Sequence, residues 1–157
     1  ALEHSGWFDA SAATYFLARG GSLSSAHEAR LLWEEAAGAP ATAMSTGGFR
    51  HGPQEMLREG VRIGLWIDAE RLRAQDLALA RDIRENGGSV MLTGQNVSPS
   101  DADLVFHLPA APAHWQFLVD VIPAQLAAER LARLRGVDCD SFRYCPYIIE
   151  TEGGLGR

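Results

Sequence analysis

The sequence contains no lysine, and all 14 of its basic residues are arginine. Because 20 residues are acidic, the formal net charge is −6, and the chain has no general electrostatic attraction to nucleic acid or to an anionic membrane. An anionic ligand would therefore require a local positive site. No apolar run approaches the roughly 18 residues that a membrane-spanning helix needs, so we expect no contact with a membrane.

Cysteine is almost absent as well. Cys139 and Cys145 are the only two cysteines, and they are not spaced as a CxxC pair. This usage does not fit a disulfide scaffold or a zinc site, and it indicates reduced thiols in a cytoplasmic protein. We expect no metal and no other cofactor.

Short apolar segments alternate with helical segments along the 157 residues, a length that suits one domain. The expected strands are 13–21, 39–45, 61–68, 89–94 and 103–109, and the expected helices are 22–38, 53–60, 69–88 and 114–136, the last kinked at Pro123. Apolar strands without alternation are typical of a parallel sheet covered on both faces. The pattern predicts an α/β fold, a three-layer αβα sandwich around a mostly five-stranded parallel sheet.

The segment MSTGGFRHGPQEML, residues 44–57, places Arg50 and His51 on a glycine-flanked loop. In open α/β sheets, ligands bind beyond the carboxyl ends of the strands, where we expect this loop to lie. Gly52 and Pro53 would fix the loop and point His51 outward. Histidine titrates near neutral pH and can move a proton, so His51 is a candidate acid–base residue; the alternative is a histidine that caps the following helix.

The segments LARGG, HEARLLWEEA, FRHGP, RENGG and VIPAQLAAERLARLRGVDCDSFR follow one another along the chain. In this order they resemble the second sugar isomerase (SIS) domain of glucosamine-6-phosphate synthase-like proteins, a group that includes related sugar-phosphate deaminases. The resemblance implies a doubly wound, flavodoxin-like sheet. It further implies a connecting segment over 1–12, the SIS domain over 13–137 and a tail over 138–157 that completes the site.

The resemblance also implies two catalytic residues. His51 matches the loop histidine that reaches into the neighbouring subunit and helps to open the sugar ring. Glu35 matches the glutamate that moves a proton between C1 and C2, for which one carboxylate suffices because the intermediate is a cis-enediol. Glu28 lies two helical turns earlier on the same face and matches a glutamate near the sugar. By residue type alone, glutamates on a surface helix indicate only solubility.

Three further positions are candidates for binding the substrate. Arg50 could contact a phosphate, pair with a carboxylate across a dimer, or form an ordinary surface salt bridge. Arg19 matches an arginine in the turn after the first strand, where a structural role is the more common one. Tyr147 stands where the synthases carry a tail lysine that assists ring opening, and tyrosine supplies no positive charge at neutral pH.

The chain departs from the synthase pattern at other positions too. Leu32 replaces a helix lysine, Gly48 replaces a loop glutamate, and the SxSGxT phosphate loop of the family's first domain is absent. The resemblance implies a phosphosugar-binding domain of an isomerase or deaminase that acts on a hexose or hexosamine 6-phosphate. Such a domain would work as a homodimer or paired with a first SIS domain. The alternative is a non-catalytic phosphosugar-binding module with a regulatory or assembly role, which the missing lysine favours.

Overall fold

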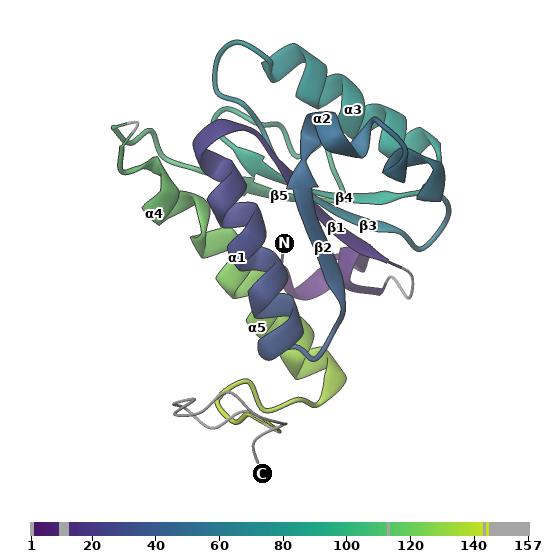
Figure 1. Ribbon diagram of the computed structural model, residues 1–157, viewed down its shortest axis with the longest axis vertical. Coiled ribbons are helices and arrows are strands. Elements are labelled where there is room, and N and C mark those ends of the chain that lie inside the picture. Colours follow the sequence, from purple (N-terminus) through teal and green to yellow (C-terminus); the bar gives the residue numbers. More distant parts are fainter. Residues whose placement is uncertain (1, 10–12, 113, 143, 145–157) are drawn as a thin grey trace.

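The computed structural model describes residues 2–9, 13–112, 114–142 and 144. Within these ranges, five parallel strands form a sheet in the order β2-β1-β3-β4-β5 (Figure 1). The strands are β1 (Thr14–Ala18), β2 (Ala41–Ser45), β3 (Arg62–Trp66), β4 (Ser89–Gly94) and β5 (Leu104–His107). This all-parallel order confirms the predicted sheet.

Helices cover both faces of the sheet (Figure 1). On one face lie α1 (Leu23–Glu35) and α5 (Ile122–Arg135), with α4 (Gln116–Asp120) beside them; on the other face lie α3 (Arg73–Glu85) and the short α2 (Thr46–Phe49). Short 3-10 helices are η1 (Leu2–His4), η2 (Gly6–Asp9), η3 (Gly20–Ser22) and η4 (Pro53–Met56). The fold is therefore the expected three-layer αβα sandwich, doubly wound around a parallel sheet.

The central strands are apolar because both of their faces are buried. All five residues of β3 are buried, and successive side chains of β1 point into different cores. Phe16 packs in the core under α1 and α5, whereas the adjacent Leu17 packs in the core under α3. The edge strand β2 contains no fully buried residue, as expected for a strand with one neighbour.

Three tryptophans and Phe16 form the centre of the core under α1. Trp33 of α1 packs edge-on against Phe16 at 5.1 Å and against Trp7 at 5.6 Å between ring centroids. Trp7 is fully buried and donates its indole N–H to the carbonyl of Ile63 at 3.3 Å. Trp7 and Phe8 of the N-terminal segment thus belong to the core, with Leu2 packed against it, a contribution that the sequence did not reveal.

The charged side chain of Arg62 is also buried in this region. Its guanidinium carbon lies 5.3 Å from the ring centroid of Trp7 and 5.9 Å from that of Trp33. At these distances the cation is attracted to the negative faces of both rings. The N-terminal segment is therefore anchored by an electrostatic contact in addition to apolar burial.

Two helical segments differ from the expectation. The long helix predicted over 114–136 is divided at Val121 into α4 and α5, because Pro123 occupies the first turn of α5, where its missing N–H costs no hydrogen bond. The helix predicted over 53–60 is the single 3-10 turn η4, and α2 precedes it where a loop was expected. No helix in the described ranges is both long and apolar enough for a membrane crossing.

Gly64, in the middle of β3, tests how tightly the core under α1 is packed. An added Cβ would lie 2.6 Å from Cδ1 of Phe16 and 3.2 Å from Cε of Met91, both fully buried. We expect Gly64→Ala to lower the free energy of unfolding by about 1–3 kcal/mol. Gly47→Ala is the control, since no atom lies within 4 Å of its added Cβ. Equal stability of the two variants in urea denaturation would refute this packing.

Candidate functional site

The order of the strands in the sheet changes direction between β1 and β3: β2 follows β1 on one side, and β4 and β5 follow β3 on the other. The connection after β1 leads to α1 on one face, and the connection after β3 leads to α3 on the other. At such a point, open α/β sheets bind ligands outside the carboxyl ends of the strands. A cavity of ≈ 620 Å³ occupies this edge, and we call it the carboxyl-edge cavity. Its lining comprises 19–22 after β1, 66–71 at the end of β3, 93–95 at the end of β4, Leu108, Ala110 and Ala111 after β5, and Gln116 and Asp120 of α4.

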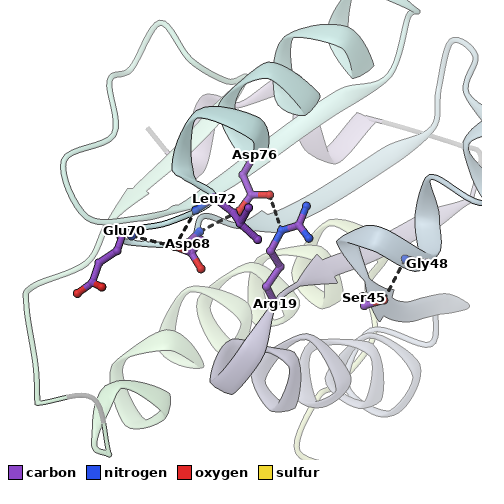
Figure 2. A network of polar contacts seen from close by, with 7 residues as sticks. All are labelled: Arg19, Ser45, Gly48, Asp68, Glu70, Leu72 and Asp76. Atoms are coloured by element: carbon purple, nitrogen blue, oxygen red, sulfur yellow. Dashed lines mark hydrogen bonds and ion pairs between the residues drawn. The ribbon is translucent and has the colours of Figure 1, made fainter.

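A buried carboxylate holds one wall of this cavity in place (Figure 2). Asp76, in the first turn of α3, is fully buried and accepts a hydrogen bond from Nε of Arg19 at 2.8 Å. Its second oxygen accepts the backbone N–H of Asp68 at 3.0 Å. The helix N-terminus also favours a negative charge at this position. Asp76 therefore connects the turn after β1 with the loop after β3.

The loop after β3 is shaped by the side chain of Asp68. Its Oδ1 accepts the backbone N–H groups of Glu70 at 2.8 Å and Leu72 at 3.3 Å (Figure 2). The hydrogen bond from Glu70 is the main cause that lowers the pKa of Asp68 below its ordinary value of 3.8, and the charge of Arg19 adds to it. Asp68 is therefore an anion at neutral pH, fixed at the cavity wall.

The opposite wall is a second hydrogen-bonded network. The buried carboxylate of Asp120 accepts the hydroxyl of Ser22 at 2.5 Å and the side-chain amide of Gln116 at 2.9 Å. Oε1 of Gln116 accepts two hydrogen bonds, from the backbone N–H of Ala111 at 3.2 Å and from Nε2 of Gln95 at 3.5 Å. Four separate segments are thus cross-linked around the cavity.

The glycine-rich segment after β2 presents Arg50 and His51 to solvent. Ser45 caps α2 by accepting the N–H of Gly48 at 3.0 Å, and Phe49 is fully buried with its ring edge-on to Tyr15 at 5.5 Å. With Phe49 anchored inward, the two following side chains are exposed. Gly52 has a φ of 128°, a backbone conformation that favours glycine, and turns the chain into η4.

Glu28 and Glu35 lie on α1, and both are exposed. Glu34 is engaged by Arg30 in an ion pair of 2.5 Å one helical turn away. Glu35, in contrast, forms no ion pair or hydrogen bond with another side chain in the part of the chain that the structure describes. The carboxylate of Glu35 is thus available to an external group, whereas that of its neighbour Glu34 is paired with Arg30 at the surface.

The structure does not bring Glu35 and His51 together within one chain. The 13-residue helix α1 starts at the carboxyl edge of the sheet and is about 20 Å long, so Glu35 lies near the amino edge, close to the start of β2. His51 follows α2 at the end of β2, and α2 packs on the face opposite to α1. Neither residue lines the carboxyl-edge cavity, and neither do Glu28 and Arg50.

Among the predicted site residues that the structure describes, Arg19 alone lines this cavity, and Asp76 forms an ion pair with it. Tyr147 lies outside the described residues, as does most of the predicted tail. No group of three or more histidine, cysteine, aspartate or glutamate side chains in the described ranges could hold a metal ion.

Apart from Arg19, the residues that build the cavity walls were not found from the sequence. Asp76 pairs with Arg19 across 57 positions, a separation that no local pattern records. Asp120 offered a weak signal, because it is the one charged residue in the otherwise apolar run FLVDVIPA. A single carboxylate in such a run indicates a buried, hydrogen-bonded acid.

Comparison with known proteins agrees with this architecture. The profile of the SIS domain matches residues 9–134. Glutamine–fructose-6-phosphate aminotransferase (isomerizing) of Pyrococcus horikoshii is 25% identical over 139 residues, which are 88% of this chain and 23% of that protein. The C-terminal domain of glucosamine-fructose-6-phosphate aminotransferase from Francisella tularensis has a TM-score of 0.77 and 25% identity, covering 89% of this chain and 40% of that one.

The chain therefore belongs to the SIS-domain family, as its sequence segments predicted. Glucosamine-6-phosphate deaminase from Thermotoga maritima shares the fold, with a TM-score of 0.70 at 20% identity over 96% of this chain and 43% of that one. The chain spans about a quarter of the length of the curated relatives that it matches.

The buried carboxylate of Asp76 yields a stability prediction. Asp76→Asn removes the charge that compensates Arg19, whose side chain is only 23% exposed. We expect a loss of about 2–3 kcal/mol in the free energy of unfolding, below the value for a fully buried pair because water reaches part of Arg19. The control Glu34→Gln breaks the exposed pair with Arg30 and should change stability by less than about 0.5 kcal/mol. Similar losses in both variants would contradict the special role of Asp76.

Asp68 yields a prediction about pH. Because its pKa is lower in the folded state than in the unfolded chain, its stabilising contribution is present above pH 3.8 and is lost as the pH falls through the folded-state pKa. The stability difference between wild type and Asp68→Asn should therefore shrink on acidification below that value. Asp82→Asn, at an exposed position of α3, is the control. A difference that stays constant in urea titrations across this range would show that the ionised form is not the stabilising one.

Proposed function

We propose that this SIS domain supplies the proton-transfer groups of a sugar-phosphate isomerase or deaminase that acts at C1 and C2 of a hexose or hexosamine 6-phosphate. The observation that carries this proposal is the state of Glu35 and His51. Both side chains are exposed, and neither has an ion pair or side-chain hydrogen bond with a described residue. Groups in this state can act on a substrate that another domain or subunit holds.

In the proposed reaction, Glu35 removes the proton from one of the two carbons and returns it to the other through a cis-enediol. His51 moves protons to and from the ring oxygen, so that the sugar opens before isomerisation and closes after it. Histidine suits this step because its ordinary pKa lies near neutral pH. General acid–base groups of this kind contribute about 10²–10⁴-fold each to the rate.

We propose a homodimer in which His51 serves the site of the neighbouring copy, since it lies at the opposite edge of the sheet from Glu35. A first SIS domain would hold the phosphate, because the chain has no phosphate loop of the SxSGxT type. Arg50 and Glu28 would contact the sugar phosphate from this chain, with Arg19 and Tyr147 in supporting positions. The low cysteine content, two residues without a CxxC spacing, further supports a cytoplasmic location.

The names of the relatives support chemistry at C1 and C2 of a sugar phosphate, but they do not identify the substrate of this chain. Their names include an isomerizing aminotransferase, and the neighbouring folds include a deaminase. Aminotransfer from glutamine would need a glutamine-hydrolysing domain, which this segment does not contain. The proposal is therefore limited to the step at C1 and C2 that both activities share.

A second candidate function is recognition of a phosphosugar without turnover, in a regulatory or assembly module. The specific observation in its favour is that the chain contains no lysine. By the resemblance to the synthases, Leu32 and Tyr147 stand where those enzymes carry lysine. Such a module would bind hexose 6-phosphates without exchanging their C1 or C2 protons.

Substitution of the two proposed catalytic residues in the complete protein tests this function. The substrates are fructose, glucosamine, N-acetylglucosamine and galactosamine 6-phosphates, and the readouts are turnover and deuterium incorporation from solvent at C1 or C2. Glu35→Gln should lower kcat by about 10²–10⁴-fold because the base is lost, and His51→Ala should do so because ring opening is slowed. Glu34→Gln, on the same helix, should leave kcat unchanged.

Unchanged turnover in Glu35→Gln would contradict the proposal. Saturable phosphosugar binding by the wild type, without any turnover or deuterium incorporation, would instead support the non-catalytic module. Inorganic phosphate is the binding control, since a shift in melting temperature with phosphate alone would not identify a sugar site.

A further inference from the structure

The helix α3 ends in an asparagine followed by two glycines, Asn86, Gly87 and Gly88. The N–H of Gly88 bonds to the carbonyl of Ile83 at 3.0 Å, and the N–H of Gly87 bonds to that of Arg84 at 3.1 Å. These two bonds define a Schellman motif, a frequent way for a helix to end at a glycine. Asn86, the C-cap residue of α3, is exposed.

The fold requires glycine at position 87 for two reasons. Its φ of 85° lies in the left-handed region, which favours glycine. A Cβ at this position would also lie 3.1 Å from the backbone nitrogen of Glu59. The chain therefore has a residue without a side chain directly after an exposed asparagine. In such an Asn-Gly pair, no Cβ obstructs the approach of the glycine nitrogen to the side-chain amide of the asparagine.

The reaction of that nitrogen with the amide is deamidation, and it needs only water as a co-reactant. The backbone nitrogen of Gly87, deprotonated by hydroxide, forms a bond to Cγ of Asn86. The bond between Cγ and Nδ2 breaks, and Nδ2 takes a proton from water and leaves as ammonia. Water then opens the succinimide ring at one of its two carbonyl carbons. Opening at Cγ gives aspartate, and opening at the main-chain carbon gives isoaspartate.

In the folded chain, both reacting groups are engaged in hydrogen bonds. The N–H of Gly87 is bonded to Arg84, and Nδ2 of Asn86 donates to the carbonyl of Asp82 at 2.8 Å, which holds the amide against the preceding turn. The reaction therefore requires that the last turn of α3 open. Helix ends open far more often than a whole domain unfolds, so this opening occurs in the native protein.

We propose that Asn86 is a site of spontaneous deamidation whose rate is set by opening of the Schellman motif. The product has a new negative charge at the C-terminal end of α3, where the helix dipole is already negative. Isoaspartate also lengthens the backbone next to Gly88, which is buried beside Ile83. We therefore expect the modified protein to melt a few degrees lower. The inference is independent of the proposed function, because none of these residues is assigned to proton transfer.

Tandem mass spectrometry of the complete protein, incubated at mildly alkaline pH in buffer or in urea, tests this proposal. Asn96 is the internal control: it is exposed, it is the only other asparagine, and the β-branched Val97 follows it. We expect Asn86 to deamidate in buffer at a rate about tenfold or more below that in urea, because the turn is mostly closed. Asn96 should stay unmodified over the same period.

Gly88→Ala separates the effect of the turn from that of the Asn-Gly pair. The added Cβ would lie 2.8 Å from Cγ2 of Ile83 and 3.2 Å from its carbonyl oxygen, so the capping bond is weakened and the turn opens more often. Deamidation of Asn86 should become severalfold faster in buffer and stay the same in urea. Gly47→Ala is the matched control, since its added Cβ meets no atom within 4 Å, and it should deamidate as the wild type does.

Amide hydrogen exchange provides a second measurement on the wild type, should Gly88→Ala fold poorly. Exchange at Gly87 gives the fraction of time that the turn is open, and this fraction should match the ratio of the deamidation rates in buffer and in urea. Equal rates in buffer and in urea, or a ratio that disagrees with the exchange, would overturn the proposal. So would an unchanged rate in folded Gly88→Ala, or equal conversion of Asn86 and Asn96.

Discussion

The ion pair between Arg19 and Asp76 connects the segments that follow β1 and β3, and the rest of the site depends on this connection. Asp76 is fully buried, so its charge needs a partner, and the guanidinium of Arg19 and the backbone N–H of Asp68 supply it. These groups come from the turn after β1, the loop after β3 and the first turn of α3. The contact therefore joins connections that leave the sheet toward opposite faces, and the carboxyl-edge cavity opens between this wall and the network around Asp120.

The fold could be predicted because each apolar segment needs burial, and all five expected strands overlap observed ones. The helix α2 was missed because Gly47 and Gly48 disfavour helix, whereas the Ser45 cap and the burial of Phe49 stabilise it in the folded chain. The exposure of His51 was anticipated from its flanking glycines. Apart from Arg19, the residues of the cavity walls were not predicted, since pairing between residues far apart in the sequence leaves no local pattern.

The arrangement separates two kinds of polar group. Residues with internal partners, such as Asp120 and Arg19, build the cavity and preserve its shape. Residues without them, Glu35 and His51, stand at opposite edges of the sheet and on opposite faces. A single copy of this domain cannot place both of these groups on one sugar. If the protein is an isomerase or deaminase, Glu35 and His51 of one copy must therefore serve different active sites in an assembly. A non-catalytic binding module has no such requirement.

Mixing of two inactive variants tests that requirement most directly. Glu35→Gln and His51→Ala, each inactive alone, are unfolded together, refolded and assayed with the sugar phosphate that the wild type converts. If His51 serves the neighbouring copy, each mixed dimer has one site with both groups intact. Random pairing makes half of the dimers mixed, so the mixture should regain roughly a quarter of wild-type activity. No recovery, with mixed dimers present, would contradict a shared site between copies.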